Sequence, residues 1–501
     1  MLFNSSQFLI FFPIVTALYF LSPHRLRWPL LLTASCVFYM AFIPVYILIL
    51  VITIIIDYLA GIYIEKTTGA KRKTFLVISI VSTCAVLCVF KYLNFFNNNF
   101  AMIARFFDLN YPVSTLKIIL PIGLSFHTFQ SLSYVIEVYR GNQKVEKHFG
   151  IYALYVMFYP QLAAGPIERP QNLLHQFREM HTLDYGKAVT GLRLMLWGMF
   201  KKVVVADRMA VLANKVYEQP SAFHGSILIL ATVCFAAQIY CDFSGYSDIA
   251  RGAARVMGFR LMRNFNNPYF SKSMAEFWKR WHISLSTWFR DYVYISLGGN
   301  RVARWRWEFN LFVTFLISGF WHGANWTYVM WGALNGLYLL AGTWLAGIGS
   351  WMRKACPIKV SKGFSGSMRV LFTFILASIG WMFFRARSIG DVTTCIHNTI
   401  QGLPLDWRLL QSHGLSQQFI KNYLAHVDMP LHEMAVNYIA IPFLLFAILL
   451  CVELYHEKRN LTRLLSSIPS AVRWSIYYGL VGCILFFGAF NNPVQFIYFQ
   501  F

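Results

Sequence analysis

Long apolar runs separated by short polar segments recur along almost the whole chain. Each run is close to the ~20 residues that cross about 30 Å of hydrocarbon as an α-helix. The pattern predicts an all-α, polytopic membrane protein with about eleven crossings, a single domain over residues 1–501 and no separate soluble domain. The candidate spans lie near residues 7–22, 28–44, 45–64, 74–91, 116–138, 150–166, 189–206, 224–241, 310–328, 330–347, 368–385, 433–454 and 473–490.

Two of these runs contain residues that interrupt helices. Run 116–138 carries Pro121 and Gly123, and run 150–166 carries Pro160. Because broken backbone at membrane depth needs protein or water around it, we expect either run to be re-entrant or broken.

Three other segments lie outside the candidate spans. Residues 259–308 are rich in Arg, Lys, Trp and Tyr and predict amphipathic helices in the cytoplasmic interface or dipping into the core. Residues 92–115 carry few charges and are expected outside the cytoplasm. Residues 387–432 contain turn formers and scattered histidines. We interpret them as an ordinary connecting loop, with a docking surface as the alternative.

Composition supports the membrane interpretation. Hydrophobic residues make up 57% of the 501 residues and charged residues only 13%, whereas about a quarter of residues are charged in soluble proteins. The net charge of +23 does not indicate nucleic-acid binding, because Lys and Arg fall in short loops between apolar runs. The positive-inside rule explains that distribution.

The basic loops predict an orientation. Under the positive-inside rule they are cytoplasmic and place both termini outside, which requires an even number of crossings and conflicts with a count of eleven. The marker residues are Arg25, Arg27, Lys71, Arg72, Lys73, Lys458 and Arg459.

Leader, cysteine and repeat signals are absent from the sequence. The first apolar run has no basic n-region and no small-residue cleavage site after it, so we interpret it as a retained helix. The nine cysteines contain no CxxC pair, which argues against a disulfide framework or a zinc site. No internal repeat of 20 to 50 residues supports an inverted-repeat transporter.

The segment WHGANWT, residues 321–327, places His322 inside an apolar run. An ionisable side chain at membrane depth marks a functional site by default. Neutral imidazole can take a proton from a hydroxyl near neutral pH, so His322 is a candidate general base. The alternative is a histidine that hydrogen-bonds a neighbouring helix and fixes packing.

Basic side chains gather in residues 276–291. Lys279, Arg280 and Arg290 could clamp the phosphates of a thioester donor at the cytoplasmic side, as cations and guanidinium forks do. Binding to anionic lipid headgroups is an equally good explanation for each single charge.

Asp242 and Asp248 stand six residues apart, so a continuous helix does not bring them to one face. We expect them to pair with nearby Lys or Arg, or to cap a helix. The turn GPIERP at 165–170 is interpreted as a rigid turn at a membrane mouth. His127 is interpreted as a satisfied core histidine rather than a cavity residue.

Several blocks together resemble one family. They are PIGLSFHTFQSLSYVIEVYRG (121–141), GPIERP (165–170), DFSGYSDIARG (242–252), FWKRWHISLSTWFRDYVYISLGGNR (277–301) and FWHGANWTYVMWGALNGLYL (320–339). The chain is identified by them as a member of the membrane-bound O-acyltransferase family, in its bacterial alginate and peptidoglycan O-acetyltransferase branch.

The resemblance implies a ring of helices around a central cavity, in which a thioester donor enters from the cytoplasm and a hydroxyl acceptor approaches from outside. His322 and His282 match the two signature positions. In that scheme His322 is the base, and His282 with Asn325 orients the acyl group or stabilises the oxyanion. Asp242 is a further candidate substrate-binding residue. A covalent acyl-enzyme remains an alternative, although no Cys adjoins either histidine.

The resemblance also implies the partners. They are an acyl thioester such as acetyl-CoA as donor substrate, a polysaccharide acceptor, membrane lipid and a separate periplasmic SGNH-type acetyltransferase. No bound cofactor, metal or nucleic acid is expected. The expected location is the cell inner membrane, as a multi-pass protein. Asn335 departs from the His common in alginate-type relatives, so alginate is not assigned as the acceptor.

Two alternatives from other classes remain: a transporter or flippase for a lipid-linked saccharide, and a structural subunit of an exopolysaccharide assembly.

Overall fold

The computed structural model describes residues 1–116, 120–162, 165–355, 361–413, 440–458, 465, 467–490 and 496–497. Helices are the regular secondary structure throughout these residues, and no strand occurs in them. The fold is therefore all-α, as predicted. Contacts divide the chain into two compact units, residues 1–198 with 246–263, and residues 199–245 with 264–501; a single domain stays a prediction.

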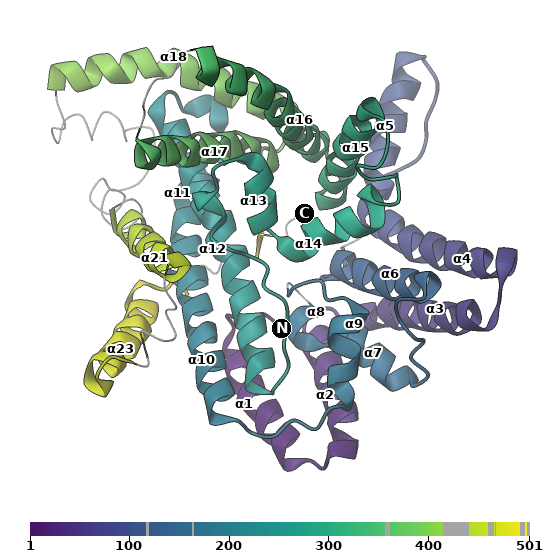
Figure 1. Ribbon diagram of the computed structural model, residues 1–501. Coiled ribbons are helices and arrows are strands. Elements are labelled where there is room, and N and C mark those ends of the chain that lie inside the picture. Colours follow the sequence, from purple (N-terminus) through teal and green to yellow (C-terminus); the bar gives the residue numbers. More distant parts are fainter. Residues whose placement is uncertain are drawn as a thin grey trace. The chain divides into compact units, whose positions relative to one another are not determined.

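The first unit contains the N-terminal helices (Figure 1). They are α1 (Ser6–Leu21), α2 (His24–Met40), α3 (Ile47–Lys66), α4 (Gly69–Leu87), α5 (Leu93–Phe106), α6 (Leu124–Arg140), α7 (Phe149–Met157), α8 (Tyr159–Leu162), α9 (Pro170–Leu173) and α10 (Tyr185–Met199).

The second unit begins with a π-helical segment, η4 (Phe200–Ala206), and contains the later helices. These are α11 (Asp207–Glu218), α13 (Met274–Arg280), α14 (Ile283–Phe289), α15 (Arg304–His322), α16 (Trp326–Ala355), α17 (Lys362–Arg385), α18 (Ile389–His413), α21 (Ile441–Lys458) and α23 (Ser470–Phe487). Helix α12 (Ser226–Val256) contributes residues to both units.

Most predicted spans coincide with helices. Within the described residues, five helical stretches are long and apolar enough to cross a membrane: Pro44–Lys66, Gly69–Phe106, Ser226–Val256, Gly363–Arg385 and Ser470–Phe487. The number of crossings stays a prediction. Of the run 433–454, residues 433–439 lie outside the described part of the chain.

Both runs predicted to be broken are broken. Helix α6 begins only at Leu124, after Gly123 in a left-handed conformation with φ of 77°. Helix α7 ends at Met157, and a separate four-residue helix follows before Gly165. The interrupting Pro and Gly residues explain both breaks.

One segment differs from the sequence interpretation. Residues 389–413 form the 25-residue helix α18, so the expected loop is wrong there, and residues 414–432 lie outside the described residues.

The segment 92–115, for which the sequence predicted only a location outside the cytoplasm, begins as a helix. A π-helical segment at Cys88–Tyr92 joins α4 to α5, which ends at Phe106. The side of the membrane stays a prediction.

Buried polar contacts join the α3, α4 and α6 helices, which lie side by side (Figure 1). The Asp57 carboxylate on α3 accepts hydrogen bonds from Ser79 at 2.6 Å and Thr83 at 3.0 Å on α4. His127 Nε2 on α6 lies 2.6 Å from Thr53 Oγ1 on α3, whereas its buried Nδ1 has no hydrogen-bond partner among the described residues, so the expectation of a satisfied core histidine is met at one ring nitrogen only. Polar pairs of this kind hold helices together where lipid removes any hydrophobic drive.

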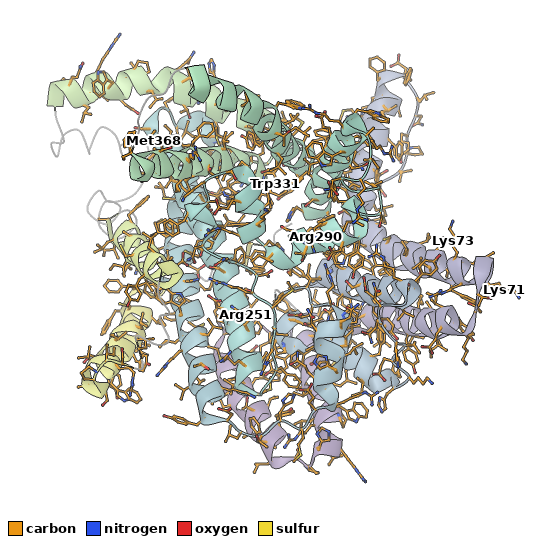
Figure 2. The ribbon with its side chains drawn as sticks, viewed as in Figure 1. Lys71, Lys73, Arg251, Arg290, Trp331 and Met368 are labelled. Carbon is orange, nitrogen blue, oxygen red and sulfur yellow. The ribbon has the colours of Figure 1, made fainter. Side chains whose placement is uncertain are left out.

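The basic residues after α3 stand at the end of this helical group. Lys71 and Lys73 lie in the first turns of α4, and their side chains project from that end (Figure 2). Such cations are expected beside the headgroups of a membrane surface.

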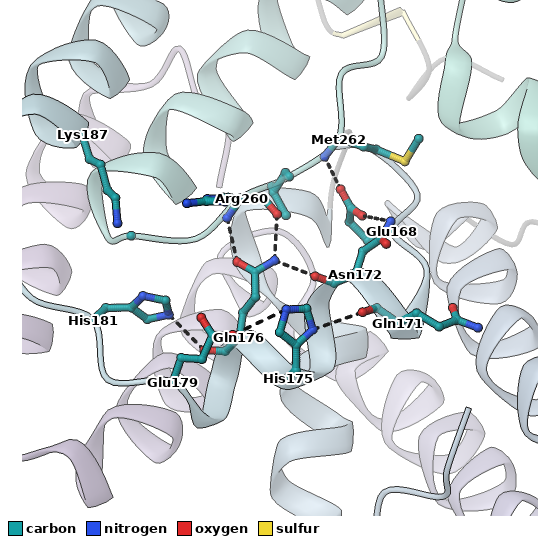
Figure 3. A pocket seen from close by; sticks show the side chains of 12 residues that line it. Glu168, Gln171, Asn172, His175, Gln176, Glu179, His181, Lys187, Arg260 and Met262 are labelled. Atoms are coloured by element: carbon teal, nitrogen blue, oxygen red, sulfur yellow. Dashed lines mark hydrogen bonds and ion pairs between the residues drawn. The ribbon is translucent and has the colours of Figure 1, made fainter. Parts of the chain in front are cut away.

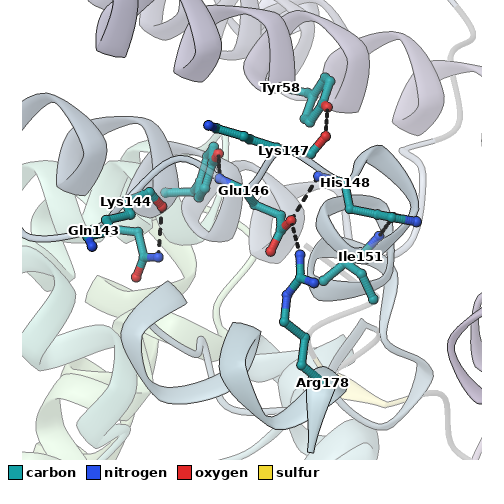
Figure 4. Close-up of polar contacts among 9 residues, drawn as sticks. Tyr58, Gln143, Lys144, Glu146, Lys147, His148, Ile151 and Arg178 are labelled. Carbon is teal, nitrogen blue, oxygen red and sulfur yellow. Dashed lines mark hydrogen bonds and ion pairs between the residues drawn. The ribbon is translucent and has the colours of Figure 1, made fainter. Parts of the chain in front are cut away.

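The entry to α7 is fixed by a small polar cluster in the first unit (Figure 4). His148 caps the helix, because its Nδ1 accepts from the Ile151 amide at 3.2 Å. Glu146 accepts from the His148 amide at 2.8 Å and pairs with Arg178. Tyr58 on α3 donates to the Lys147 carbonyl at 2.6 Å, so this loop is tied to a membrane helix.

In the second unit, α15 and α16 approach with their backbones almost in contact. A Cβ at Gly319 would lie 2.4 Å from the Tyr328 carbonyl oxygen, and a Cβ at Gly332 would lie 2.4 Å from that of Phe315. Small residues permit such close helix packing in membranes. A turn of only three residues joins the two helices between His322 and Trp326.

Gly332→Leu is expected to separate α15 from α16 and to destabilise the protein by about 3 kcal/mol or more. This loss exceeds the usual cost of overpacking, because the new side chain would meet backbone atoms rather than movable side chains. Thermal unfolding in detergent measures the effect. Gly342→Leu on the same helix is the matched control, since nothing lies within 4 Å of a Cβ there. Equal melting temperatures for the two variants would contradict the close packing.

Candidate active site

His322 is the last residue of α15 and is buried, with 5% of its surface exposed. Its ring is surrounded by aromatic rings from two further helices. Trp331 on α16 lies at a centroid distance of 4.9 Å, edge to face, and Phe384 on α17 lies at 5.3 Å. Side chains of three helices, α15, α16 and α17, therefore meet at this imidazole. Such a buried position favours a functional role for His322.

His282 lies between two seven-residue helices, α13 and α14, in a left-handed conformation with φ of 42°. Asn264 holds the start of α14, because its backbone and side-chain oxygens accept from the amides of Ile283 at 2.9 Å and Ser284 at 3.2 Å. A non-glycine residue in this conformation costs energy and persists where its surroundings enforce it. Asn264 thus helps to position His282.

His282 itself is 1% exposed and packs edge to face on Phe243 of α12 at 4.5 Å. Burial lowers the pKa of His282 to about 3, because an apolar environment disfavours the charged ring. The imidazole is therefore neutral at physiological pH, with one nitrogen as donor and the other as acceptor.

A continuous set of aromatic rings joins the surroundings of the two histidines. Phe265 lies 6.4 Å from His282 and 5.1 Å from Trp281. Trp281 lies 4.8 Å from Trp381, which stacks at 6.0 Å on Trp331 beside His322. Trp331 is labelled in Figure 2. The second unit thus brings both sequence-predicted histidines to one aromatic core.

Asn325 lies at the start of α16. Its Oδ1 accepts from the Thr327 amide at 3.0 Å, and its Nδ2 donates to the Arg387 carbonyl at 2.8 Å. These contacts orient the turn after His322, and they leave one N–H of the amide for a further acceptor.

The predicted donor-binding cations differ in their surroundings. Arg280 pairs with Glu276 at 2.8 Å, and Arg290 pairs with Asp291 at 2.8 Å. Lys279 is exposed. Acid neighbours reduce the attraction of Arg280 and Arg290 for an anion, so the stretch is less positive than the sequence indicated.

Asp242 is buried in an ion-pair cluster rather than exposed to a cavity. Lys202 Nζ lies 2.9 Å from Asp242 Oδ1 and 2.7 Å from Asp207 Oδ1. The other oxygen of Asp242 accepts from the Ile497 amide at 2.8 Å. The expected pairing of Asp242 with a basic residue is thus confirmed. Asp248 pairs with Arg251 at 3.3 Å, in the first unit.

Lys202 and Asp207 were missed from the sequence, and so was a second buried ion pair of the same unit. Lys201 lies 3.3 Å from Glu453, which also accepts from Tyr240 at 2.6 Å. All three are buried. The available signal was ionisable residues inside apolar runs, Lys201 and Lys202 in one and Glu453 in another.

Within the described residues no group of three His, Cys, Asp or Glu side chains is arranged to hold a metal ion.

A separate polar pocket of about 490 Å³ lies in the first unit (Figure 3). Glu168 of the GPIERP turn lines it and accepts from the Met262 amide. Gln176 bonds both the amide and the carbonyl of Arg260, at 2.8 and 3.0 Å. Burial raises the pKa of Glu168 to about 7. Hydrogen bonds thus fix Glu168 in the turn, and its carboxyl has a pKa near neutrality.

These features define the class of the protein: an all-helical membrane protein with two buried histidines in an aromatic core. Sequence comparison identifies its family. Residues 148–384 match the family model for MBOAT, the membrane-bound O-acyltransferase family.

Similar curated proteins cover most of the chain. "Probable alginate O-acetylase AlgI" of Azotobacter vinelandii is 41% identical over 395 residues, which are 78% of this chain and 76% of that protein. "Peptidoglycan O-acetyltransferase" of Helicobacter pylori is 31% identical over 486 residues and 89% of each chain. "Teichoic acid D-alanyltransferase" of Bacillus subtilis is 28% identical over 234 residues, 44% of this chain and 58% of that protein. The chain belongs to the membrane-bound O-acyltransferase family and is an acyltransferase.

Asp242→Ala is expected to lower stability by about 2 kcal/mol or more, because the buried Lys202 loses one of two acid partners and the Ile497 amide loses its acceptor. Thermal unfolding and membrane abundance measure the loss. Glu218→Ala, at the exposed end of α11, is the control. A normal melting temperature together with a raised KM for a substrate would instead assign Asp242 to substrate binding.

Glu168→Gln is expected to reduce the pH dependence of stability between pH 5 and 7. The folded-state pKa of about 7 lies above the unfolded value of about 4.3, so the unfolded chain releases the proton first as pH rises. Wild-type stability therefore falls as pH rises between these two values, by about 1.4 kcal/mol for each pH step of one. Glutamine keeps an acceptor for Met262 but cannot ionise. Identical pH dependence of the two melting temperatures would contradict the assignment.

Proposed function

We propose that this protein is an O-acetyltransferase of the inner membrane, which moves acetyl from a cytoplasmic thioester such as acetyl-CoA toward hydroxyls of an extracytoplasmic polysaccharide. The similarity to alginate and peptidoglycan O-acetyltransferases supports the acetyl group and the acceptor class. A separate periplasmic SGNH-type protein would complete the transfer. The buried His322 in its aromatic surroundings is the observation that carries the proposal.

In the proposed reaction His322 is the general base. A hydroxyl oxygen attacks the thioester carbonyl, and the imidazole of His322 takes the hydroxyl proton. When the C–S bond breaks, the thiolate leaves and takes that proton from the imidazolium. The hydroxyl proton thus ends on the leaving sulfur, which also keeps the electron pair of the C–S bond, and the step balances without a cofactor.

Neutral donors would stabilise the oxyanion of the tetrahedral intermediate. His282 is neutral because its pKa is low, and Asn325 has one amide N–H beyond its bond to Arg387. Donors fixed before the reaction stabilise developing charge strongly in a dry site. The aromatic rings around His322 would exclude the water that hydrolyses a thioester.

The donor side is assigned to the basic stretch. The exposed Lys279 is proposed to attract the phosphates of the thioester donor. Arg280 and Arg290 would contribute when the donor phosphates replace Glu276 and Asp291 as their ion-pair partners. A transporter or scaffold receives no support from the comparisons, because the relatives named above are acyl-transferring enzymes.

His322→Ala is expected to reduce ester on cell-surface polysaccharide by a factor of about 100 or more, the range of general base catalysis. Ester content is measured in cells with matched membrane abundance. His397→Ala, an exposed histidine on α18, is the control and should retain wild-type ester. Wild-type ester content in the His322→Ala variant would overturn the proposal and favour the transporter and scaffold hypotheses.

A further inference from the structure

A groove of about 980 Å³ lies in the second unit between α17, α21 and residues 269–280. Its lining residues recur at helical spacing, from Gly363 to Phe374 on α17 and from Phe443 to Leu454 on α21. Each helix thus presents one stripe to the groove.

These stripes would normally pack against each other. Two helices with such stripes interdigitate at 8–10 Å, typically by ridges-into-grooves packing. Within the described residues the stripes flank an open volume instead, and Val370, Leu371 and Leu450 line it with apolar surface. Since α17 is a candidate membrane span and α21 is a short apolar helix, this part of the groove suits an apolar occupant.

One end of the groove is positive. Glu276 pairs with Arg280 at 2.8 Å and accepts the Lys272 amide at 2.9 Å. The exposed Lys272 ammonium pairs with no carboxylate among the described residues, so one net positive charge remains. The Lys272 stem runs beside α17, 4.0 Å from where a Cβ at Gly366 would stand.

The start of α17 adds to this positive end. Ser361 caps the helix by accepting from the Phe364 amide at 3.2 Å, and the N-terminal end of a helix carries a partial positive charge. From Gly363 to Phe374 the helix rises about 16 Å, close to half of the ~30 Å hydrocarbon thickness. The groove therefore has the length of one lipid leaflet, with the cation at its polar end.

We propose that this groove binds one anionic phospholipid of the cytoplasmic leaflet, with acyl chain along α17 and α21 and phosphate at Lys272. The lipid is a bound ligand, not the acyl acceptor, and the inference does not depend on the role of His322. Charge complementarity selects the occupant, because anionic lipids concentrate in the cytoplasmic leaflet and attract nearby cations.

Native mass spectrometry of the full-length protein in detergent tests the proposal, with phosphatidylglycerol and phosphatidylcholine as probes. Wild-type protein is expected to retain one phosphatidylglycerol in preference to phosphatidylcholine. Val370→Trp places a bulky side chain in the groove and should weaken retention, whereas Phe372→Trp, at a 62% exposed position on the same helix, should not.

A second pair of variants tests the polar end. Lys272→Gln should weaken phosphatidylglycerol binding about fivefold, the effect of one cation at a lipid surface, and leave phosphatidylcholine unchanged. Arg301→Gln, an exposed cation outside the groove, should match wild type. The proposal would be overturned if the two lipids bound equally or if neither groove variant had an effect. Displacement of phosphatidylglycerol by acetyl-CoA would also overturn it, because the groove would then bind the acyl donor.

Discussion

The second unit depends on how it neutralises charge inside apolar surroundings. Lys202 is fully buried and lies between Asp207 and Asp242, at 2.7 and 2.9 Å. A lone buried cation would cost several kcal/mol, so the three side chains are stable only together. The same Asp242 accepts the amide of Ile497, so this cluster joins η4, α11, α12 and residues near the end of the chain.

The cluster and the proposed site share α12. Phe243 follows Asp242 directly and packs on His282 at 4.5 Å, and Phe496 lies 5.7 Å from Phe243. The imidazole is therefore held by an aromatic layer whose helix is anchored by buried ion pairs. Rigid support of this kind is what a neutral donor needs if it is to meet developing charge without reorganisation.

Close backbone packing between α15 and α16 positions His322. Gly319 and Gly332 allow α15 and α16 to touch, and the short turn then directs His322 toward Trp331 and Phe384. Polar anchoring and glycine contact are the two means available where lipid removes the usual hydrophobic drive between helices. Each histidine is positioned by one of them.

The sequence by itself determined the all-α membrane class, most helix positions, the broken runs and the place of His322 inside an apolar run, because hydrophobic length, proline, glycine and ionisable residues in apolar runs are local signals. His282 was selected only by the family resemblance. It did not determine that α18 is a helix, since the polar segment 389–413 lacks a span pattern. It also could not reveal that Asp242 pairs with Lys202, or that Lys201 pairs with Glu453. Only the tertiary structure decided those pairs, because the pairing of charges distant in sequence depends on how helices pack and not on residue spacing.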